Sequence, residues 1–146
     1  MTLPDWRNNG WLVEHKPTRS EIRDLFAVID RDLKDSRVSG ISDDCRLNVA
    51  YNAALQAATV GLAVSGYRAA RDAHHYRVIQ SLALTIGMPA DLILRFDKFR
   101  KKRNVGDYER AGNVSAREAE EMTAFAENLR RGVLDWLAAN HPDLVP

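Results

Sequence analysis

One short segment of the chain places several phosphate-binding residue types on a single helical face. These residues recur at the spacing i, i+3, i+4, i+7 and i+8, and they are Arg100, Arg103, Asn104, Asp107 and Tyr108. A guanidinium group binds phosphate through two parallel charge-assisted hydrogen bonds. The asparagine amide adds donors and acceptors, and the tyrosine ring adds a stacking surface. The spacing therefore predicts a phosphate-binding face.

The same segment concentrates positive charge. From Arg95 to Arg110 there are seven basic and three acidic residues, a local net charge of +4, whereas the whole chain carries +1. Attraction of an anion would therefore be local rather than a property of the whole surface. A structural alternative stays open, because charged runs are often structural. In this alternative, Arg103 forms an ion pair with Asp107 one turn later, and Tyr108 caps the pair.

A second basic segment, from Tyr67 to Arg77, contains the adjacent histidines His74 and His75. Histidine titrates near neutral pH and can act as an acid, a base or a donor to phosphate. The structural alternative gives His74 a capping role at a helix start and leaves His75 as a partly buried polar neighbour. Adjacent residues on a helix point about 100° apart, so the two rings are poorly placed to share an ion. We expect no metal site and no cofactor.

Composition bounds the class of protein. The chain has 146 residues, 45% hydrophobic and 28% charged, which suits one soluble domain with its own core. The lone Cys45 cannot form an intrachain disulfide, and we expect it to be a small buried residue. The N-terminus lacks the apolar run of a signal peptide, and the least polar stretch, residues 53–66, is too short to span a bilayer. We expect a cytoplasmic protein with no membrane partner.

The elements that must position the two basic segments are predicted to be helices. Capping boxes at Thr18 and Ser115 begin two of them, and Ser42 caps a third. The helix after Ser42 is apolar almost all round, which is typical of a central, buried helix. Two further helices begin near His74 and Pro89.

We therefore expect an all-α fold, an antiparallel bundle of four to five helices over residues 18–140. An N-terminal arm, residues 1–17, packs on it through Trp6 and Trp11, and residues 141–146 form a tail. No segment alternates over the length of a strand, so no sheet is expected. The central helix carries an uncharged polar stripe that we expect to face the arginines, because buried amides need partners; its members are Asn48, Asn52 and Gln56.

Two stretches resemble a known family. The sequence GYR followed by HHYRVIQSL, together with FRKKRNVGDYE on the fourth predicted helix, is similar to HEPN domains (higher eukaryotes and prokaryotes nucleotide-binding). The similarity runs from about Thr18 to Trp136. It extends to small bacterial stand-alone HEPN proteins, some of which pair with a minimal nucleotidyltransferase as toxin and antitoxin. The resemblance implies a homodimer, RNA or a nucleotide as ligand, a toxin-antitoxin or defence module, and a nucleotidyltransferase as a further partner.

The family signature is matched in its first half. It consists of an arginine, usually followed by a polar residue, and a histidine after four to six intervening residues. Arg103 and Asn104 match the first part, whereas the positions for the histidine hold Tyr108, Glu109 and Arg110. Active members are metal-independent ribonucleases with two copies of the motif across a dimer interface. In them the arginine steadies phosphate, and the histidine assists attack by the ribose 2′-hydroxyl.

The missing histidine leaves three interpretations open. The first is a metal-independent ribonuclease with Arg103 and Asp107 as catalytic residues, or with His74 or His75 in the histidine's role. The second is a non-catalytic adaptor that presents substrate to, or is modified by, a nucleotidyltransferase. The third is a bundle whose basic stripe only organises dimerisation. The phosphate-binding residues of the first two are Arg100, Arg103, Asn104, Tyr108, His74 and His75.

A homodimer through the fourth predicted helix is expected on grounds of packing. Leu92, Phe96 and Phe99 form an apolar stripe on that helix, and Arg103 and Asp107 continue it at helical spacing. A monomer would leave these two polar residues exposed or poorly packed. A partner copy across a two-fold axis would cover them and form a cleft between the two helices.

Overall fold

Helices make up most of the protein. The structure is a computed structural model that describes residues 1–108 and 113–146, with the backbone alone described for residues 104–108. Its elements, in order, are α1 (Leu3–Asn8), β1 (Leu12–Glu14), α2 (Arg19–Asp35), α3 (Asp43–Val64), β2 (Tyr67–Ala69), α4 (His74–Ser81), α5 (Ala90–Tyr108), α6 (Ala116–Asn140) and a 3-10 turn, η1 (Pro142–Leu144). The predicted helical bundle is confirmed at this level.

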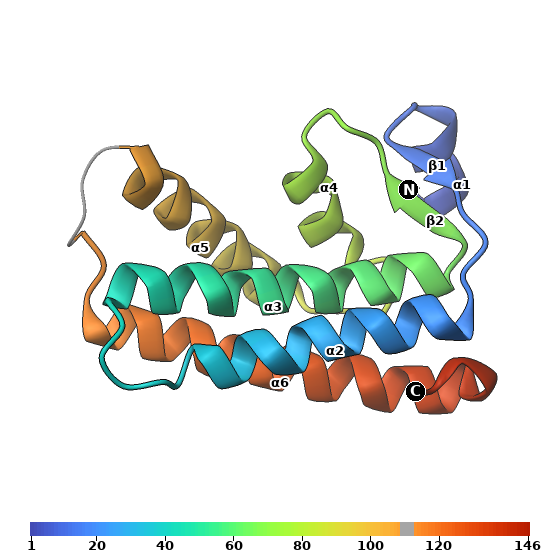
Figure 1. Cartoon of the computed structure of the whole chain (residues 1–146). Helices are drawn as coiled ribbons and strands as arrows, with labels where there is room; N and C mark the ends of the chain where they lie inside the picture. Colours follow the sequence, from blue (N-terminus) through green and yellow to red (C-terminus); the bar gives the residue numbers. More distant parts are fainter. Residues whose placement is uncertain (109–112) are drawn as a thin grey trace.

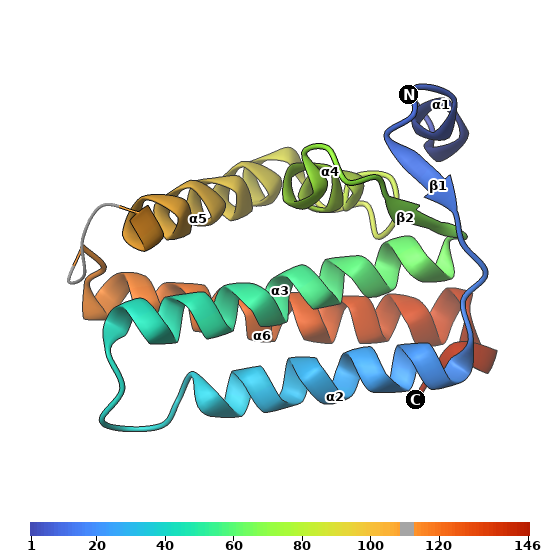
Figure 2. The same cartoon turned by 45° about the horizontal axis from the view of Figure 1, so that its top comes forward.

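Helix α3 is the centre of the fold. Figure 1 shows α2 and α6 along one side of it and α4 and α5 along the other, and Figure 2 shows the same layers from a second direction. Of the helices in the described part of the chain, only α3 is long and apolar enough to cross a membrane, but most of its apolar stretch is buried inside the protein. An apolar surface buried in this way is typical of a core helix.

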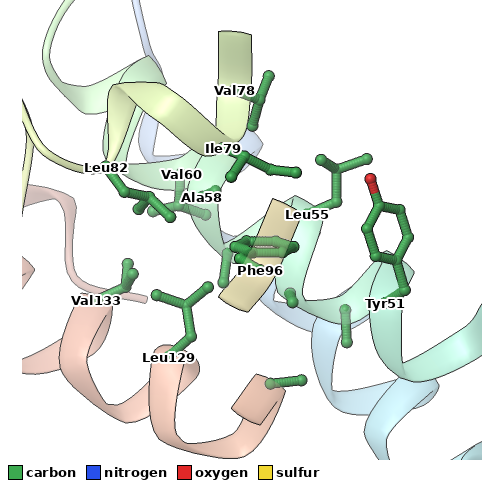
Figure 3. Packing of buried hydrophobic residues seen from close by; sticks show 14 of the residues in the cluster. Tyr51, Leu55, Ala58, Val60, Val78, Ile79, Leu82, Phe96, Leu129 and Val133 are labelled. Atoms are coloured by element: carbon green, nitrogen blue, oxygen red, sulfur yellow. The ribbon is translucent and has the colours of Figure 1, made fainter. Parts of the chain in front are cut away.

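The core is built around one aromatic residue of α5. Phe96 is fully buried, and its ring lies edge-on to those of Tyr51 from α3 and Phe125 from α6, with centroids 5.9 Å and 5.1 Å away. Figure 3 shows Ile79 of α4 and Leu129 of α6 on either side of it. Burying one such ring contributes about 1.5–3 kcal/mol, so Phe96 is a main anchor of α5.

The predicted helix starts are present, with one correction. Thr18 accepts a hydrogen bond from the Glu21 backbone N–H at 3.1 Å, and Ser42 accepts one from the Cys45 N–H at 3.0 Å. The carboxylate of Glu21 does not complete the predicted box. It hydrogen bonds to Nε2 of His15 at 2.8 Å, because the N-terminal arm places that ring beside the first turn of α2.

The expectation of no sheet is wrong. Strands β1 and β2 pair in antiparallel fashion, with Leu12 opposite Ala69, and tie the N-terminal arm to the segment before α4. Each strand has three residues, which is too short for an alternating pattern to be visible in the sequence. The rings of Trp6 and Trp11 contact each other beside this sheet, and the Arg77 guanidinium lies 3.7 Å from the Trp11 ring centroid.

Two polar expectations are also corrected. Cys45 is exposed rather than buried, because it lies on the first turn of α3, ahead of the buried part of the helix. Asn52 donates a hydrogen bond to Oδ2 of Asp32 on α2 at 2.7 Å, and Gln56 donates to the Asn52 side chain at 3.3 Å. Asn52 and Gln56 therefore serve α2 rather than the arginines of α5. Asp32 is buried, and a buried carboxylate needs such a donor.

Candidate functional site

Helices α3, α4 and α5 bring the two predicted basic segments together. The Tyr51 hydroxyl of α3 is hydrogen bonded to Nδ1 of His75 on α4 at 3.1 Å. On the α5 side, the Arg103 guanidinium carbon lies 5.3 Å from the centroid of the Tyr51 ring. We refer to the residues gathered here as the arginine–histidine cluster; they are Tyr51, His74, His75, Tyr76, Arg100 and Arg103.

Tyr51 contacts both the histidine and the arginine side of this cluster. It is 1% exposed, its ring rests edge-on against Phe96, and it lies beside Leu55 at the margin of the core (Figure 3). A buried tyrosine hydroxyl needs a hydrogen-bond partner, and His75 supplies one. Burial raises the pKa of Tyr51 to about 12, with the positive charges of Arg103 and Arg100 opposing that rise. The group is therefore a neutral phenol at physiological pH.

His75 is half-buried and favours its neutral form. Its pKa is lowered from the ordinary 6.5, first by loss of hydration and then by the positive charge of Arg103, with smaller contributions from His74 and Arg100. The tautomer depends on the bond to Tyr51. If the tyrosine donates to Nδ1, the imidazole N–H is at Nε2; if Nδ1–H donates to the tyrosine, Nε2 is a base.

Asp97 holds Arg100 in place. Nε of Arg100 donates to Oδ1 of Asp97 at 2.7 Å, and the ammonium of Lys101 lies 3.6 Å from Oδ2 of the same carboxylate. Asp97 is buried, and its hydrogen bond raises the pKa of Arg100, which is a cation at any physiological pH. The Arg100 guanidinium carbon lies 5.7 Å from the ring centroid of Tyr76, whose side chain is exposed. Arg100 is thus a fixed charge beside an exposed aromatic face.

Four of the predicted site residues are described, and all four lie in or beside the cluster: Arg100, Arg103, His74 and His75. His74 is at the exposed edge, with its ring centroid 6.1 Å from that of His75 and its Nδ1 3.3 Å from the Ala70 carbonyl oxygen. The side chains of the other three, Asn104, Asp107 and Tyr108, lie outside the described residues. So does the predicted Arg103–Asp107 ion pair.

Sequence reasoning missed three members of this region: Tyr51, Tyr76 and Asp97. A signal for Tyr51 was present, because it is the one aromatic residue in the alanine-rich helix α3 and its hydroxyl needs a partner. Asp97 stands three residues before Arg100 and four before Lys101, which is the spacing of helical ion pairs. Nothing in the sequence showed that α4 would carry its histidines to Tyr51.

Two further findings bear on the function of the site. In the described part of the chain, no three histidine, cysteine, aspartate or glutamate side chains lie close enough to hold a metal ion. Comparison of the chain with models of known families, with curated proteins and with solved structures finds no match. The geometry of the arginine–histidine cluster therefore carries the functional assignment.

Proposed function

We propose that this protein binds RNA or a nucleotide through phosphate contacts at the arginine–histidine cluster, as a HEPN-like component of a toxin-antitoxin or defence module. The observation that carries the proposal is the meeting of Arg100 and Arg103 with the neutral His75 around one buried hydroxyl. These groups come from two segments far apart in the sequence. Two guanidinium groups and an imidazole on rigid helices are suited to an anion with several oxygens.

The charges around Arg100 favour an anionic ligand. The buried carboxylate of Asp97 pairs with both Arg100 and Lys101, so one negative charge serves two cations. Arg103 lies beside Tyr51 in the same cluster. The exposed ring of Tyr76 next to Arg100 offers a stacking face for a base, which favours a nucleotide or single-stranded RNA over a free phosphate ion.

A second function, metal-independent RNA cleavage, is favoured by the position of His75. In that reaction the ribose 2′-oxygen loses its proton and bonds to phosphorus, while the bond from phosphorus to the 5′-oxygen breaks and that oxygen takes up a proton. His75 with a bare Nε2 is a base for the first proton, and with a protonated Nε2 it is a donor to the leaving oxygen. His75 would then supply from α4 the role that the family assigns to a histidine on the arginine's own helix.

The homodimer stays a prediction, but the packing of α5 no longer argues for it. Arg103 contacts the Tyr51 ring within one chain, so its position does not by itself require a partner copy. The side chain of Asp107, the other residue used in that argument, lies outside the described residues. The homodimer and a nucleotidyltransferase partner therefore enter the proposal through the resemblance to HEPN proteins alone.

Titration with a labelled single-stranded RNA that lacks terminal phosphates tests the proposed function. We expect saturable binding that weakens as salt rises, since each phosphate contact releases counterions. Recovery of the RNA on a gel separates the two functions, because cleavage yields discrete fragments in the presence of a chelator and simple binding yields none. Failure to bind at low salt would remove the proposal.

Binding of this RNA is expected to tighten as the pH falls. The pKa of His75 in the free protein is below 6.5, and a nearby phosphate raises it by favouring the charged ring. Between the free and bound pKa values the complex holds more protons than the free protein, so affinity increases as pH decreases through that window. For one group the increase reaches at most about tenfold per pH unit.

The pH dependence is assigned by comparing variants. His75→Gln is expected to flatten it. His141→Gln, which changes a histidine beside Trp136 at the C-terminal end, should leave it unchanged. His74→Gln tests whether the neighbouring exposed ring contributes to the pH dependence. An equal slope in wild type and His75→Gln would show that His75 does not face the bound phosphate.

A further inference from the structure

A separate apolar pocket of about 370 Å³ lies between the start of α5 and the middle of α6. Its walls include Leu92 of α5, Met88 of the preceding loop, and Phe125 and Leu129 of α6. It shares no residue with the arginine–histidine cluster. Its volume falls within the range of about 300–1,000 Å³ that is usual for small-molecule sites, which are mostly apolar with a few polar groups.

Aromatic residues keep the two helices apart at this point. Phe96 and Phe99 of α5 contact Phe125 of α6, with ring centroids 5.1 Å and 5.9 Å away. Leu129 lies below Phe96 in Figure 3 and also lines the pocket, so the pocket borders directly on the core. Its inner wall is therefore as rigid as the core itself.

Gly132 is the residue that leaves the α6 wall of the pocket open. It lies inside α6, where a glycine makes a helix less stable than an alanine does. A Cβ atom built there would meet no atom within 4 Å. Gly61 of α3 shows the contrasting case, since a Cβ there would lie 3.2 Å from Oγ1 of Thr85. Close packing thus explains Gly61 but not Gly132. At Gly132 the missing side chain enlarges the cavity.

Arg95 gives the pocket a positive rim. Its guanidinium carbon lies 5.9 Å and 6.0 Å from the ring centroids of Phe99 and Phe125, and its side chain lines the pocket. In the described part of the chain, no carboxylate lies within ion-pair distance of it. Asn128 adds an amide to the lining. An apolar cavity with an exposed guanidinium at its edge is complementary to a ligand with an apolar body and an anionic end.

We propose that this pocket binds a small amphipathic carboxylate, with its hydrocarbon part against Leu92, Phe125 and Leu129 and its carboxylate on Arg95. The site is independent of the proposed function, because it uses other residues, which lie near the opposite end of α5 from Arg100 and Arg103. The hydrocarbon part supplies affinity through burial, and the guanidinium selects the anion over a neutral molecule of the same shape.

Titration with octanoate, and with 1-octanol as its neutral counterpart, tests the proposal. Binding is followed by calorimetry and by the backbone amide signals of Gly87 and Gly132, which line the pocket. We expect saturable binding of octanoate at millimolar concentration or below, with shifts at both amides. Absence of binding, or binding without a change at either glycine, would overturn the proposal.

Two pairs of variants separate the apolar and the anionic contributions. Gly132→Leu fills the cavity and is expected to weaken the binding of both probes at least about tenfold. Gly132→Ala should leave the binding of both probes unchanged. Arg95→Gln is expected to weaken octanoate about tenfold and to leave 1-octanol unchanged, and Lys98→Gln on the same helix should change neither. Equal octanoate affinity in Arg95→Gln and Lys98→Gln would refute the anionic ligand, even if Gly132→Leu fails to fold.

Discussion

Replacing Phe96 by alanine is expected to lower the free energy of unfolding by about 3–5 kcal/mol. The ring is fully buried, and it contacts both Tyr51 of α3 and Phe125 of α6. Its removal leaves a cavity where α3, α5 and α6 meet, and neighbouring side chains can fill it only in part. Urea denaturation followed by circular dichroism measures the loss.

Leu94→Ala is the matched control for this substitution. Leu94 lies on the same helix, two residues away, and is 57% exposed. We expect its removal to change the free energy of unfolding by no more than about 0.5 kcal/mol. A loss below about 1 kcal/mol for Phe96→Ala would show that α5 is not anchored to the core through this ring.

The sequence predicts the helices of this protein well because their ends are marked by local chemistry. Ser115 and Glu118 form a complete capping box at the start of α6, and Gly66 adopts the left-handed conformation expected after α3, with φ +98°. These features depend on residues within a few positions of each other. They can therefore be read without knowing the rest of the fold.

The errors come from contacts between distant segments. Glu21 has the spacing of a capping box, but His15 approaches it from the N-terminal arm and takes its carboxylate. Asn52 was expected to face the arginines, but the buried Asp32 of α2 takes its amide. In both cases a partner from another element replaced the local one, and helical spacing alone cannot show which element will pack on which face.

The candidate site shows the same difference between local signals and contacts of distant segments. The arginines and histidines could be identified from their types and their local spacing. The apolar helix around Tyr51 indicates only that this residue lies in the core. Only the packing of α4 and α5 against α3 shows that its hydroxyl reaches His75 while its ring lies under Arg103. The fold turns two basic segments into one cluster.

Replacing Arg103 by alanine is expected to lower the affinity for single-stranded RNA about ten- to a hundredfold. A charge-assisted hydrogen-bond donor to phosphate contributes about 1.5–3 kcal/mol, and each 1.4 kcal/mol is tenfold in affinity. Arg103→Lys should retain only part of the wild-type affinity, because lysine lacks the planar fork of the guanidinium. Lys98→Ala, which removes an exposed charge from the same helix, measures the general electrostatic effect.

Thermal melting of the same variants distinguishes phosphate binding from a structural role. If Arg103 serves phosphate, Arg103→Ala loses its contact with the Tyr51 ring, worth about 0.5–1 kcal/mol, and remains folded while binding fails. If Arg103 instead neutralises a buried Asp107, its removal leaves that carboxylate unpaired and costs up to about 3–5 kcal/mol. A large fall in Tm with unchanged RNA affinity would contradict the assignment of Arg103 to phosphate. Lost binding at an unchanged Tm would support it, and Asp107→Asn would then show whether any RNA cleavage depends on that carboxylate.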